Sequence, residues 1–293
     1  MTVLPPLERI PADILSAADY EGRAADHLNL PTLAWLAGGS GTERTLNANR
    51  SAFDDLLVRP RLLNDFSRAS TRVDLPGLAL NHPLLLAPLG HQRLLHTEAE
   101  QASARAAAAT GCGFVASTLS SLSLEDIAAA TDQSKWFQLY FQPRRNDTLT
   151  LLRRAEAAGY QAIVVTLDTP VQPLSRRAQL AGFRFPADQV PVNLRAFLPA
   201  DQVALASGQS IVLHGMMSEA PRWEDLGWLV EQCRLPVLVK GVAHPADAQR
   251  LRDMGVAGQI VSNHGGRALD GSTASLAMLP AIRSALGSDY PVL

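Results

Sequence analysis

Seven short apolar runs, separated by longer stretches with helical periodicity, are the feature that most restricts the fold of this chain. Each run is short and contains few polar residues, which is typical of a parallel strand buried on both faces. The runs are LLLAP from Leu84, CGFVAS from Cys112, WFQLY from Trp136, AIVVTLD from Ala162, PVLVKG from Pro236, GQIVSN from Gly258 and YPVL from Tyr290. Strands that alternate with helices throughout predict an α/β protein, and we expect a TIM (β/α)8 barrel.

Three of the intervening stretches carry signals for the start of a helix. The stretch 97–110 opens with Thr and Glu in capping-box spacing, and 123–130 opens with Ser and Asp in the same spacing. Pro245 occupies a position suited to the first turn of a further helix. These signals support the alternation of strands and helices.

One interval between strands is much longer than the others. The starts of successive runs lie 28, 24, 26, 74, 22 and 32 residues apart. An excess of roughly 45 to 50 residues over an ordinary βα unit predicts an insertion over 169–222. We interpret it as an active-site loop, with a disordered surface excursion as the alternative.

The segment before the first run predicts a small addition to the barrel rather than a separate domain. TRVDLPGLALNHP indicates a hairpin that turns at Pro76-Gly77 and covers the floor of the barrel. We therefore expect a single domain over 1–293, with an amino-terminal helical segment and hairpin over 1–83 and the barrel over 84–293.

The number of runs is one short of a closed barrel, which needs eight strands to leave no exposed edge. The seventh run only begins at Tyr290. We expect the carboxyl-terminal strands to be missing from this chain. Either the sequence is a fragment of a longer polypeptide or another chain supplies the strands, and the first interpretation is favoured.

Composition and charge exclude several classes of partner. A net charge of −2 and a pI near 6.4, without dense runs of Lys or Arg, argue against nucleic acid and anionic lipid. No apolar run is long enough to cross a bilayer. Cys112 and Cys233 lack the spacing of a metal site or a redox pair. We expect a cytoplasmic protein without a metal and without a membrane or nucleic-acid partner.

The loop SNHGGRALDG follows a predicted strand directly and carries Asn263, His264 and Arg267. In a parallel α/β protein the carboxyl ends of the strands are where ligands bind and chemistry occurs. A histidine there can titrate near neutral pH, and the two glycines let a planar ligand approach the backbone closely. This loop is the strongest functional signal in the sequence.

Seven motifs, in the same order along the chain, resemble the FMN-dependent α-hydroxy acid oxidase and dehydrogenase family, which includes glycolate oxidase, lactate oxidase and flavocytochrome b2. The motifs are NANRSAF, APLGHQRLLHTEAE, STLSSLSLED, FQLYFQ, VTLDTP, LVKGV and SNHGGRALD. The resemblance covers nearly the whole chain. It implies FMN as cofactor, a 2-hydroxy acid as substrate, oxygen or another electron acceptor, and a homo-oligomer, commonly a tetramer.

The resemblance also implies roles for individual residues. His264 would be the active-site base, Asp168 would orient it, and Arg177 and Arg267 would bind the substrate carboxylate. Tyr140 would contact the substrate oxygen. Lys240 would lie beside N1 and the C2 oxygen of the flavin. The other residues implied to contact the flavin are Ala87, Pro88, Leu89, Ser117, Gln138, Thr166 and Ser262. The implied pocket also contains Leu119, and Trp35 stands where the family commonly has a tyrosine.

Elementary chemistry supports these residue types. Oxidation of a 2-hydroxy acid needs a base near the hydroxyl, and a buried carboxylate such as Asp168 can stabilise the imidazolium that forms. Arginine suits the planar substrate carboxylate, and a fixed cation such as Lys240 suits charge that develops on a reduced flavin.

Each residue also has a structural interpretation. Lys240 could be a strand-end lysine that reaches solvent, Asp168 could cap a turn, and Tyr140 could fill the barrel. Arg176 competes with Arg177, because an RR pair in a loop is usually a solvated surface feature.

The leading hypothesis is therefore FMN-dependent oxidation of a small or aryl L-2-hydroxy acid to the 2-keto acid. The alternatives are a specialised flavin-dependent biosynthetic oxidation or decarboxylation, and a noncatalytic barrel that serves as a scaffold.

Overall fold

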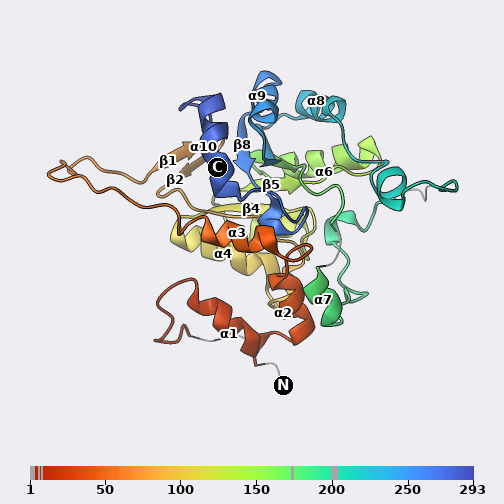
Figure 1. Ribbon diagram of the computed structural model, residues 1–293, viewed down its shortest axis with the longest axis horizontal. Coiled ribbons are helices and arrows are strands. Elements are labelled where there is room, and N and C mark those ends of the chain that lie inside the picture. Colours follow the sequence, from red (N-terminus) through yellow and green to blue (C-terminus); the bar gives the residue numbers. More distant parts are fainter. Residues whose placement is uncertain (1–3, 6, 8, 173–174, 199–203) are drawn as a thin grey trace.

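The computed structural model describes residues 4–5, 7, 9–172, 175–198 and 204–293. Its centre is a parallel sheet with the strand order β3-β4-β5-β6-β7-β8, and helices cover its outer face (Figure 1). The strands are β3 (Leu85–Leu86), β4 (Gly113–Ser117), β5 (Trp136–Leu139), β6 (Ala162–Thr166), β7 (Val237–Val242) and β8 (Gly258–Val261). The helices are α1 (Asp19–His27), α2 (Leu30–Ala37), α3 (Arg44–Ser51), α4 (Ala99–Thr110), α5 (Leu124–Ala129), α6 (Arg145–Ala157), α7 (Arg176–Leu180), α8 (Trp223–Gln232), α9 (Pro245–Asp253) and α10 (Ser275–Leu286).

The predicted alternation of strands and helices is confirmed, and the sheet is a curled part of a (β/α)8 barrel. The seventh run contributes Val292, which forms an isolated parallel bridge with Gln259 of β8. The backbone amides of Gln259 and Leu293 continue this pairing, since each donates to a carbonyl across the bridge, at 2.9 Å in both cases. The strands found in the described part of the chain do not close into a ring.

Side chains on the two faces of the sheet form two separate apolar clusters. The outer cluster joins strand residues such as Phe137 and Ile163 to helix residues such as Leu151, all fully buried. The inner cluster contains alternate strand residues, among them Val115, Trp136 and Val164. Because side chains alternate along a strand, this division fixes which positions face the interior of the barrel.

The predicted hairpin is present as β1 (Val73–Leu75) and β2 (Leu78–Leu80), which pair antiparallel around Pro76-Gly77. Leu78 and Leu80 of β2 belong to the inner cluster, and Trp136 at the start of β5 donates from Nε1 to the Pro76 carbonyl at 3.0 Å. The hairpin therefore covers the amino-terminal ends of the strands, as predicted. The hairpin leaves the carboxyl-terminal ends of the strands uncovered, so a ligand can bind there.

The helix-start predictions for Ser123 and Pro245 are confirmed: Ser123 caps α5, and Pro245 begins α9. The capping box predicted at Thr97 is wrong. Helix α4 begins at Ala99 without a side-chain cap. The carboxylate of Glu100 turns inward instead, where it accepts from the amides of Gln92 at 3.2 Å and Ser121 at 2.8 Å. Glu100 thus ties two loops together, because burial of its side chain outweighs local capping.

The insertion contains α7, a 3-10 turn over Val192–Leu194 and a π-helix over Ile211–Met216. Residues 173–174 and 199–203 of the expected range lie outside the described residues. In Figure 1, α7 lies beside α2, so the insertion meets the amino-terminal segment. No helix in the described ranges is long and apolar enough to cross a membrane.

Helix α3 is fastened to the loop that carries His264. The amides of Asn49 and Asn263 exchange two hydrogen bonds, at 2.8 and 2.7 Å. The carboxylate of Asp270 accepts from the amides of Thr42 at 2.8 Å and Thr45 at 2.9 Å, at the amino terminus of α3. Anionic groups are favoured at this end of a helix. Hydrogen bonds lower the pKa of Asp270 to about 2, and the one from the Thr45 amide has the largest effect. Partial burial of the carboxylate opposes this shift, and the hydrogen bonds from Thr42 add to it.

The Asp270 contact predicts a specific dependence of stability on acid. A carboxyl group whose pKa is lower in the folded state stabilises the fold while it is ionised. Its contribution is complete above the ordinary value of 3.8 and is lost as the pH falls toward 2. We expect Asp270→Asn to lower the melting temperature most above about pH 4, and the difference from the unmodified protein to shrink between about pH 4 and 2. Thermal melts across this range measure it, with Asp54→Asn on the exposed end of the α3 region as control. A difference that is constant with pH would contradict the assignment.

Candidate active site

Alternation along the strands brings a polar group to the inner face at the end of four neighbouring strands. Ser117 lies two positions after Val115 of the inner cluster, and Gln138 two positions after Trp136. Thr166 lies two positions after the inner residue Val164, and Lys240 two positions after Leu238. Ser117 is the register partner of Gln138 on the neighbouring strand, and Thr166 is that of Lys240. The positions predicted to contact a flavin therefore share one face and one end of the sheet.

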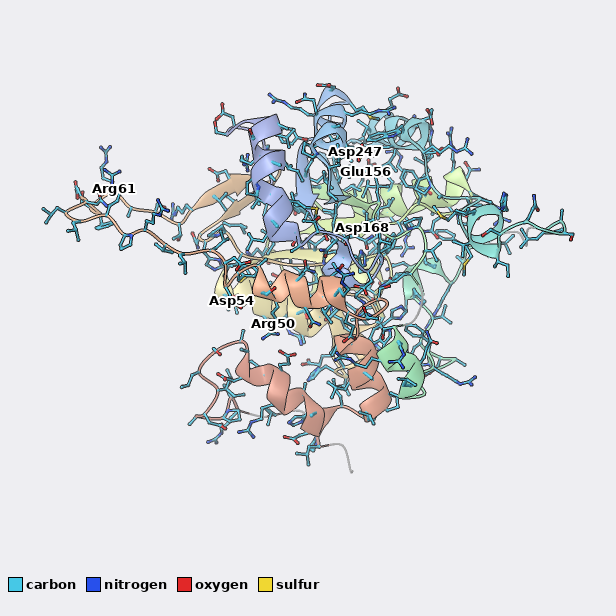
Figure 2. The ribbon with its side chains drawn as sticks, viewed as in Figure 1. Arg50, Asp54, Arg61, Glu156, Asp168 and Asp247 are labelled. Atoms are coloured by element: carbon cyan, nitrogen blue, oxygen red, sulfur yellow. The ribbon has the colours of Figure 1, made fainter. Side chains whose placement is uncertain are left out.

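Asp168, Lys240 and His264 form a compact, largely buried cluster near the carboxyl ends of these strands. His264 Nδ1 lies 2.8 Å from Asp168 Oδ1, and Lys240 Nζ lies 3.5 Å from Asp168 Oδ2 and 3.4 Å from His264 Nδ1. The side chain of Asp168 is only 8% exposed, that of Lys240 11% and that of His264 18%. Figure 2 labels Asp168 well inside the outline of the molecule. The interpretations of Lys240 as a solvent-facing lysine and of Asp168 as a turn cap do not account for this cluster.

Burial and charge act in opposite directions on the cluster. Burial by itself raises the pKa of Asp168, but the hydrogen bond from His264 and the charge of Lys240 outweigh it, so the pKa lies below its ordinary value. Burial lowers the pKa of Lys240, and Asp168 opposes this shift. An ionised Asp168 accepts from Nδ1 of His264. The other ring nitrogen, Nε2, is then the one that can take a proton.

The backbone of the histidine loop adopts left-handed conformations at three consecutive residues. The φ angles are 58° at His264, 62° at Gly265 and 71° at Gly266. A Cβ at Gly266 would lie 2.6 Å from the Leu46 backbone nitrogen, so glycine is required there. The Asn263 side chain accepts from the Gly266 amide at 3.1 Å and holds the turn. Such strain persists where the surrounding contacts enforce it, commonly at functional sites.

The residues at the strand ends fit a flavin. Gln138 Nε2 and Thr166 Oγ1 are buried and lack any hydrogen-bond partner in the described part of the chain. Buried polar atoms are normally paired, so these two indicate a polar ligand at the inner face beside Lys240. The Ser117 hydroxyl donates to the side-chain oxygen Oε1 of Gln138 at 3.2 Å, which leaves Nε2 of the same side chain for that ligand. Ser262 Oγ accepts from the His264 amide at 3.0 Å.

The backbone over Ala87, Pro88 and Leu89 follows β3 and lies beside the loop that carries Leu119. The His91 amide donates to the Leu119 carbonyl at 3.0 Å, and Gly90 is so close to Leu119 that a Cβ would lie 2.8 Å from its side chain. Predicted flavin-contacting and pocket residues therefore adjoin one another here.

The two predicted carboxylate-binding arginines both contact the amino-terminal segment. Arg267 donates to the carbonyls of Trp35, Leu36 and Gly38 at 3.0, 3.0 and 2.9 Å, at the end of α2. Arg177, on the half-exposed first turn of α7, forms an ion pair with Glu43. Among the described residues, neither guanidinium contacts the side chains of Asp168, Lys240 or His264.

Trp35 belongs to an aromatic cluster that the sequence reasoning missed. Its ring stacks on Phe183 at 5.3 Å and meets Phe185 edge-on at 5.4 Å. His91 lies 4.8 Å from Phe185, and burial lowers the pKa of His91. The FRF sequence in the insertion was the available signal, but its partners, Trp35 and His91, come from two distant segments.

Tyr140 lies at the rim of a cavity of about 190 Å³, together with Thr166, Thr169, Met216 and Glu219. Burial raises the pKa of Tyr140, so its hydroxyl stays protonated and can donate a hydrogen bond. A larger cavity of about 580 Å³ lies away from this cluster, between α1 and the turn that contains Arg93. No group of three or more metal-binding side chains is found in the described ranges.

Comparison with known proteins gives one consistent result. The family described as FMN-dependent dehydrogenase matches residues 24–293. An L-lactate oxidase from Alicycliphilus denitrificans is 54% identical over 98% of this chain and 79% of its own length. A 4-hydroxymandelate oxidase from Amycolatopsis orientalis is 41% identical over 95% of this chain and 78% of its own length.

Solved structures agree in fold. A mandelate oxidase variant with a C4a-OH-FMN adduct superposes with a TM-score of 0.82 at 38% identity, covering 94% of this chain and 76% of the other. Mandelate oxidase with (S)-2-phenylpropionate gives 0.82 at 39% identity, covering 94% and 75%. FMN is therefore the cofactor. The chain belongs to the FMN-dependent α-hydroxy acid oxidase and dehydrogenase family.

Proposed function

We propose that this oxidoreductase converts a small or aryl L-2-hydroxy acid to the 2-keto acid, with oxygen as electron acceptor and His264 as base. The hydrogen bond between Asp168 and His264 is the observation that carries the proposal. The names of its relatives, L-lactate oxidase and 4-hydroxymandelate oxidase, support both the reaction and the range of substrates.

The geometry of the cluster suits proton transfer from the substrate hydroxyl. Asp168 fixes His264 with its Nδ1 proton inward, and Nε2 accepts the hydroxyl proton. The imidazolium that forms is stabilised by the adjacent carboxylate. The α-hydrogen and its bonding electron pair, a hydride equivalent, would pass to FMN when it is bound. Lys240, Gln138, Thr166 and Ser117 would hold it, and Lys240 supplies a positive charge at that end of the sheet.

Arg267 and Arg177 would bind the substrate carboxylate. Arg267 uses three of its five N–H donors on backbone carbonyls. Nε and one hydrogen of Nη2 remain, and these are two nitrogens through which a guanidinium can bind a carboxylate. Arg177 would have to exchange Glu43 for the substrate. Its exposure makes that exchange inexpensive, because half-exposed ion pairs contribute little.

Anaerobic mixing of the FMN-loaded protein with 2-hydroxy acids tests the reaction. We expect L-lactate, glycolate or L-mandelate to bleach the visible flavin band, because two electrons enter FMN with no oxygen to remove them. D-lactate is the stereochemical control. Analysis of the product under oxygen separates a 2-keto acid with peroxide from a decarboxylated acid. A flavin band that no 2-hydroxy acid bleaches would refute the proposal.

His264→Asn tests the base. Asparagine tolerates the left-handed backbone at this position, so the loop is retained. We expect the rate of flavin reduction to fall by roughly 10²- to 10⁴-fold, while the visible spectrum shows that FMN is still bound. His244→Asn is the matched control, since residue 244 is exposed and caps α9, a role that asparagine fills well. Equal rates in the two variants would remove His264 from the reaction.

Lysine substitutions separate the two arginines. Arg177→Lys is expected to raise KM by at least about tenfold with an unchanged melting temperature, because lysine cannot bind a carboxylate through two fixed donors. Arg267→Lys is expected to raise KM and also to lower the melting temperature, since the contacts with three α2 carbonyls are lost. Arg176→Lys is the neighbouring control. An increase in KM for Arg176→Lys alone would transfer the role to Arg176.

A further inference from the structure

The buried side chain of Asn193, in the insertion, joins three elements of the barrel. Asn193 is 1% exposed. Its Nδ2 donates to the Ser120 hydroxyl at 2.9 Å and to the Thr118 carbonyl at 3.4 Å. Its Oδ1 accepts from the Leu124 amide at 2.9 Å, at the start of α5. Both ends of the amide are therefore used, and in opposite senses.

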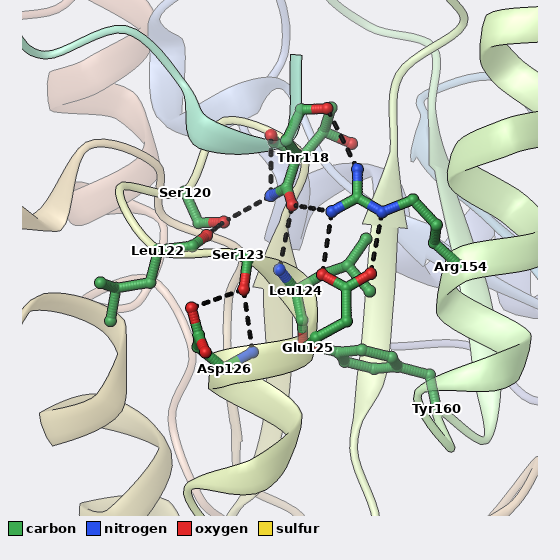
Figure 3. A network of polar contacts seen from close by, with 10 residues as sticks. Thr118, Ser120, Leu122, Ser123, Leu124, Glu125, Asp126, Arg154 and Tyr160 are labelled. Carbon is green, nitrogen blue, oxygen red and sulfur yellow. Dashed lines mark hydrogen bonds and ion pairs between the residues drawn. The ribbon is translucent and has the colours of Figure 1, made fainter. Parts of the chain in front are cut away.

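A charged pair holds Asn193 from the other side. Arg154 of α6 binds both carboxylate oxygens of Glu125, at 2.8 and 2.9 Å. The same guanidinium donates to Asn193 Oδ1 at 3.2 Å and to its backbone carbonyl at 3.3 Å. Figure 3 shows Arg154 reaching across from its helix to Glu125. Two-point binding of this kind fixes orientation as well as position.

Thr118 connects Asn193 to two predicted site residues. The Thr118 hydroxyl donates to the Gln138 carbonyl at 2.6 Å and accepts from the Tyr140 amide at 3.2 Å. The Thr118 amide donates to Gln138 Oε1 at 3.2 Å. Because Gln138 Oε1 is held here, its Nε2 is the atom that faces the flavin site.

Leu119 lies between the two residues that Asn193 holds. Thr118 precedes it and Ser120 follows it, and both accept from Nδ2. The backbone on either side of this pocket residue is thus fixed by one side chain of the insertion. The insertion is fixed to the barrel at this point.

We propose that Asn193 is a positioning residue, which sets Leu119 at the substrate pocket and Gln138 and Tyr140 at the strand ends. The inference rests on the proposed function, since it assigns these three residues to the site. The role requires an amide. Aspartate keeps an acceptor oxygen toward Leu124 and Arg154. Its other carboxylate oxygen would face the Thr118 carbonyl, so the hydrogen bonds that Nδ2 donates would be lost.

Amide hydrogen exchange of the full chain without FMN tests the structural part independently of activity. We expect Asn193→Asp to raise exchange in the segments 117–124 and 136–141, by roughly tenfold for loss of buried hydrogen bonds. Asn146→Asp, an exposed residue in the first turn of α6, makes the same chemical change and should leave both segments unaltered. Unchanged exchange in 117–124 with Asn193→Asp would overturn the proposal.

The kinetic test distinguishes positioning from simple loss of stability. With FMN bound, Asn193→Asp should raise KM and the dissociation constant for FMN by about tenfold, while the pH profile set by the His264 cluster is retained. Ser120→Ala, a smaller change, should shift KM in the same direction by about twofold to fivefold. A lowered melting temperature with unchanged KM and FMN affinity in both variants would make Asn193 purely structural and refute the inference. If the unmodified chain binds FMN but oxidises no 2-hydroxy acid, the proposed function fails instead, and the exchange result still decides the contacts.

Discussion

The hydrogen bond between Asp168 and His264 is the contact on which the site depends, and the surrounding structure serves to bring these two residues together. They lie 96 positions apart in the chain and meet because β6 and β8 end at the same edge of the sheet. Gly241, with a φ of 107°, lies on the intervening strand. Because glycine has no side chain, this strand can pass close to Asp168, where a Cβ would lie 2.6 Å from the Asp168 Cβ. Burial strengthens this hydrogen bond. It also means that loss of either partner would leave an unpaired charge at this depth, which would be strongly destabilising.

Segments outside the sheet hold the histidine loop from two directions. Helix α3 fixes the loop through the Asn49 and Asn263 amides and through Asp270. Helix α2 receives Arg267 at its carboxyl end, where backbone carbonyls favour a cation. The insertion contacts the loop after β4 through Asn193, which donates to Thr118 and Ser120. The geometry of the candidate site therefore depends on additions to the barrel as well as on the strands.

Much of the fold followed from patterns that span a few residues. Strand positions were predictable because a buried parallel strand needs an apolar run, and the hairpin because Pro76-Gly77 suits a tight turn. The polar strand ends were predictable from the period of two together with the family resemblance. The capping box at Thr97 failed because Glu100 found partners in two other loops, which no local pattern reveals. The contacts of Arg177 with Glu43 and of Trp35 with Phe183 were missed for the same reason.

The sequence by itself determined the alternation of strands and helices, the direction in which each strand side chain points, and the set of residue types available for flavin-dependent oxidation. These are short-range properties, fixed by backbone geometry and by side-chain chemistry. Only the tertiary structure decided which of those residues meet, how deeply each is buried, and which donors remain free. Such properties depend on contacts between segments 70 to 230 positions apart, as between Lys240 and Asp168 or between Arg267 and α2. These contacts are stabilised because the packed segments together exclude water from them, and no single segment can exclude water by itself.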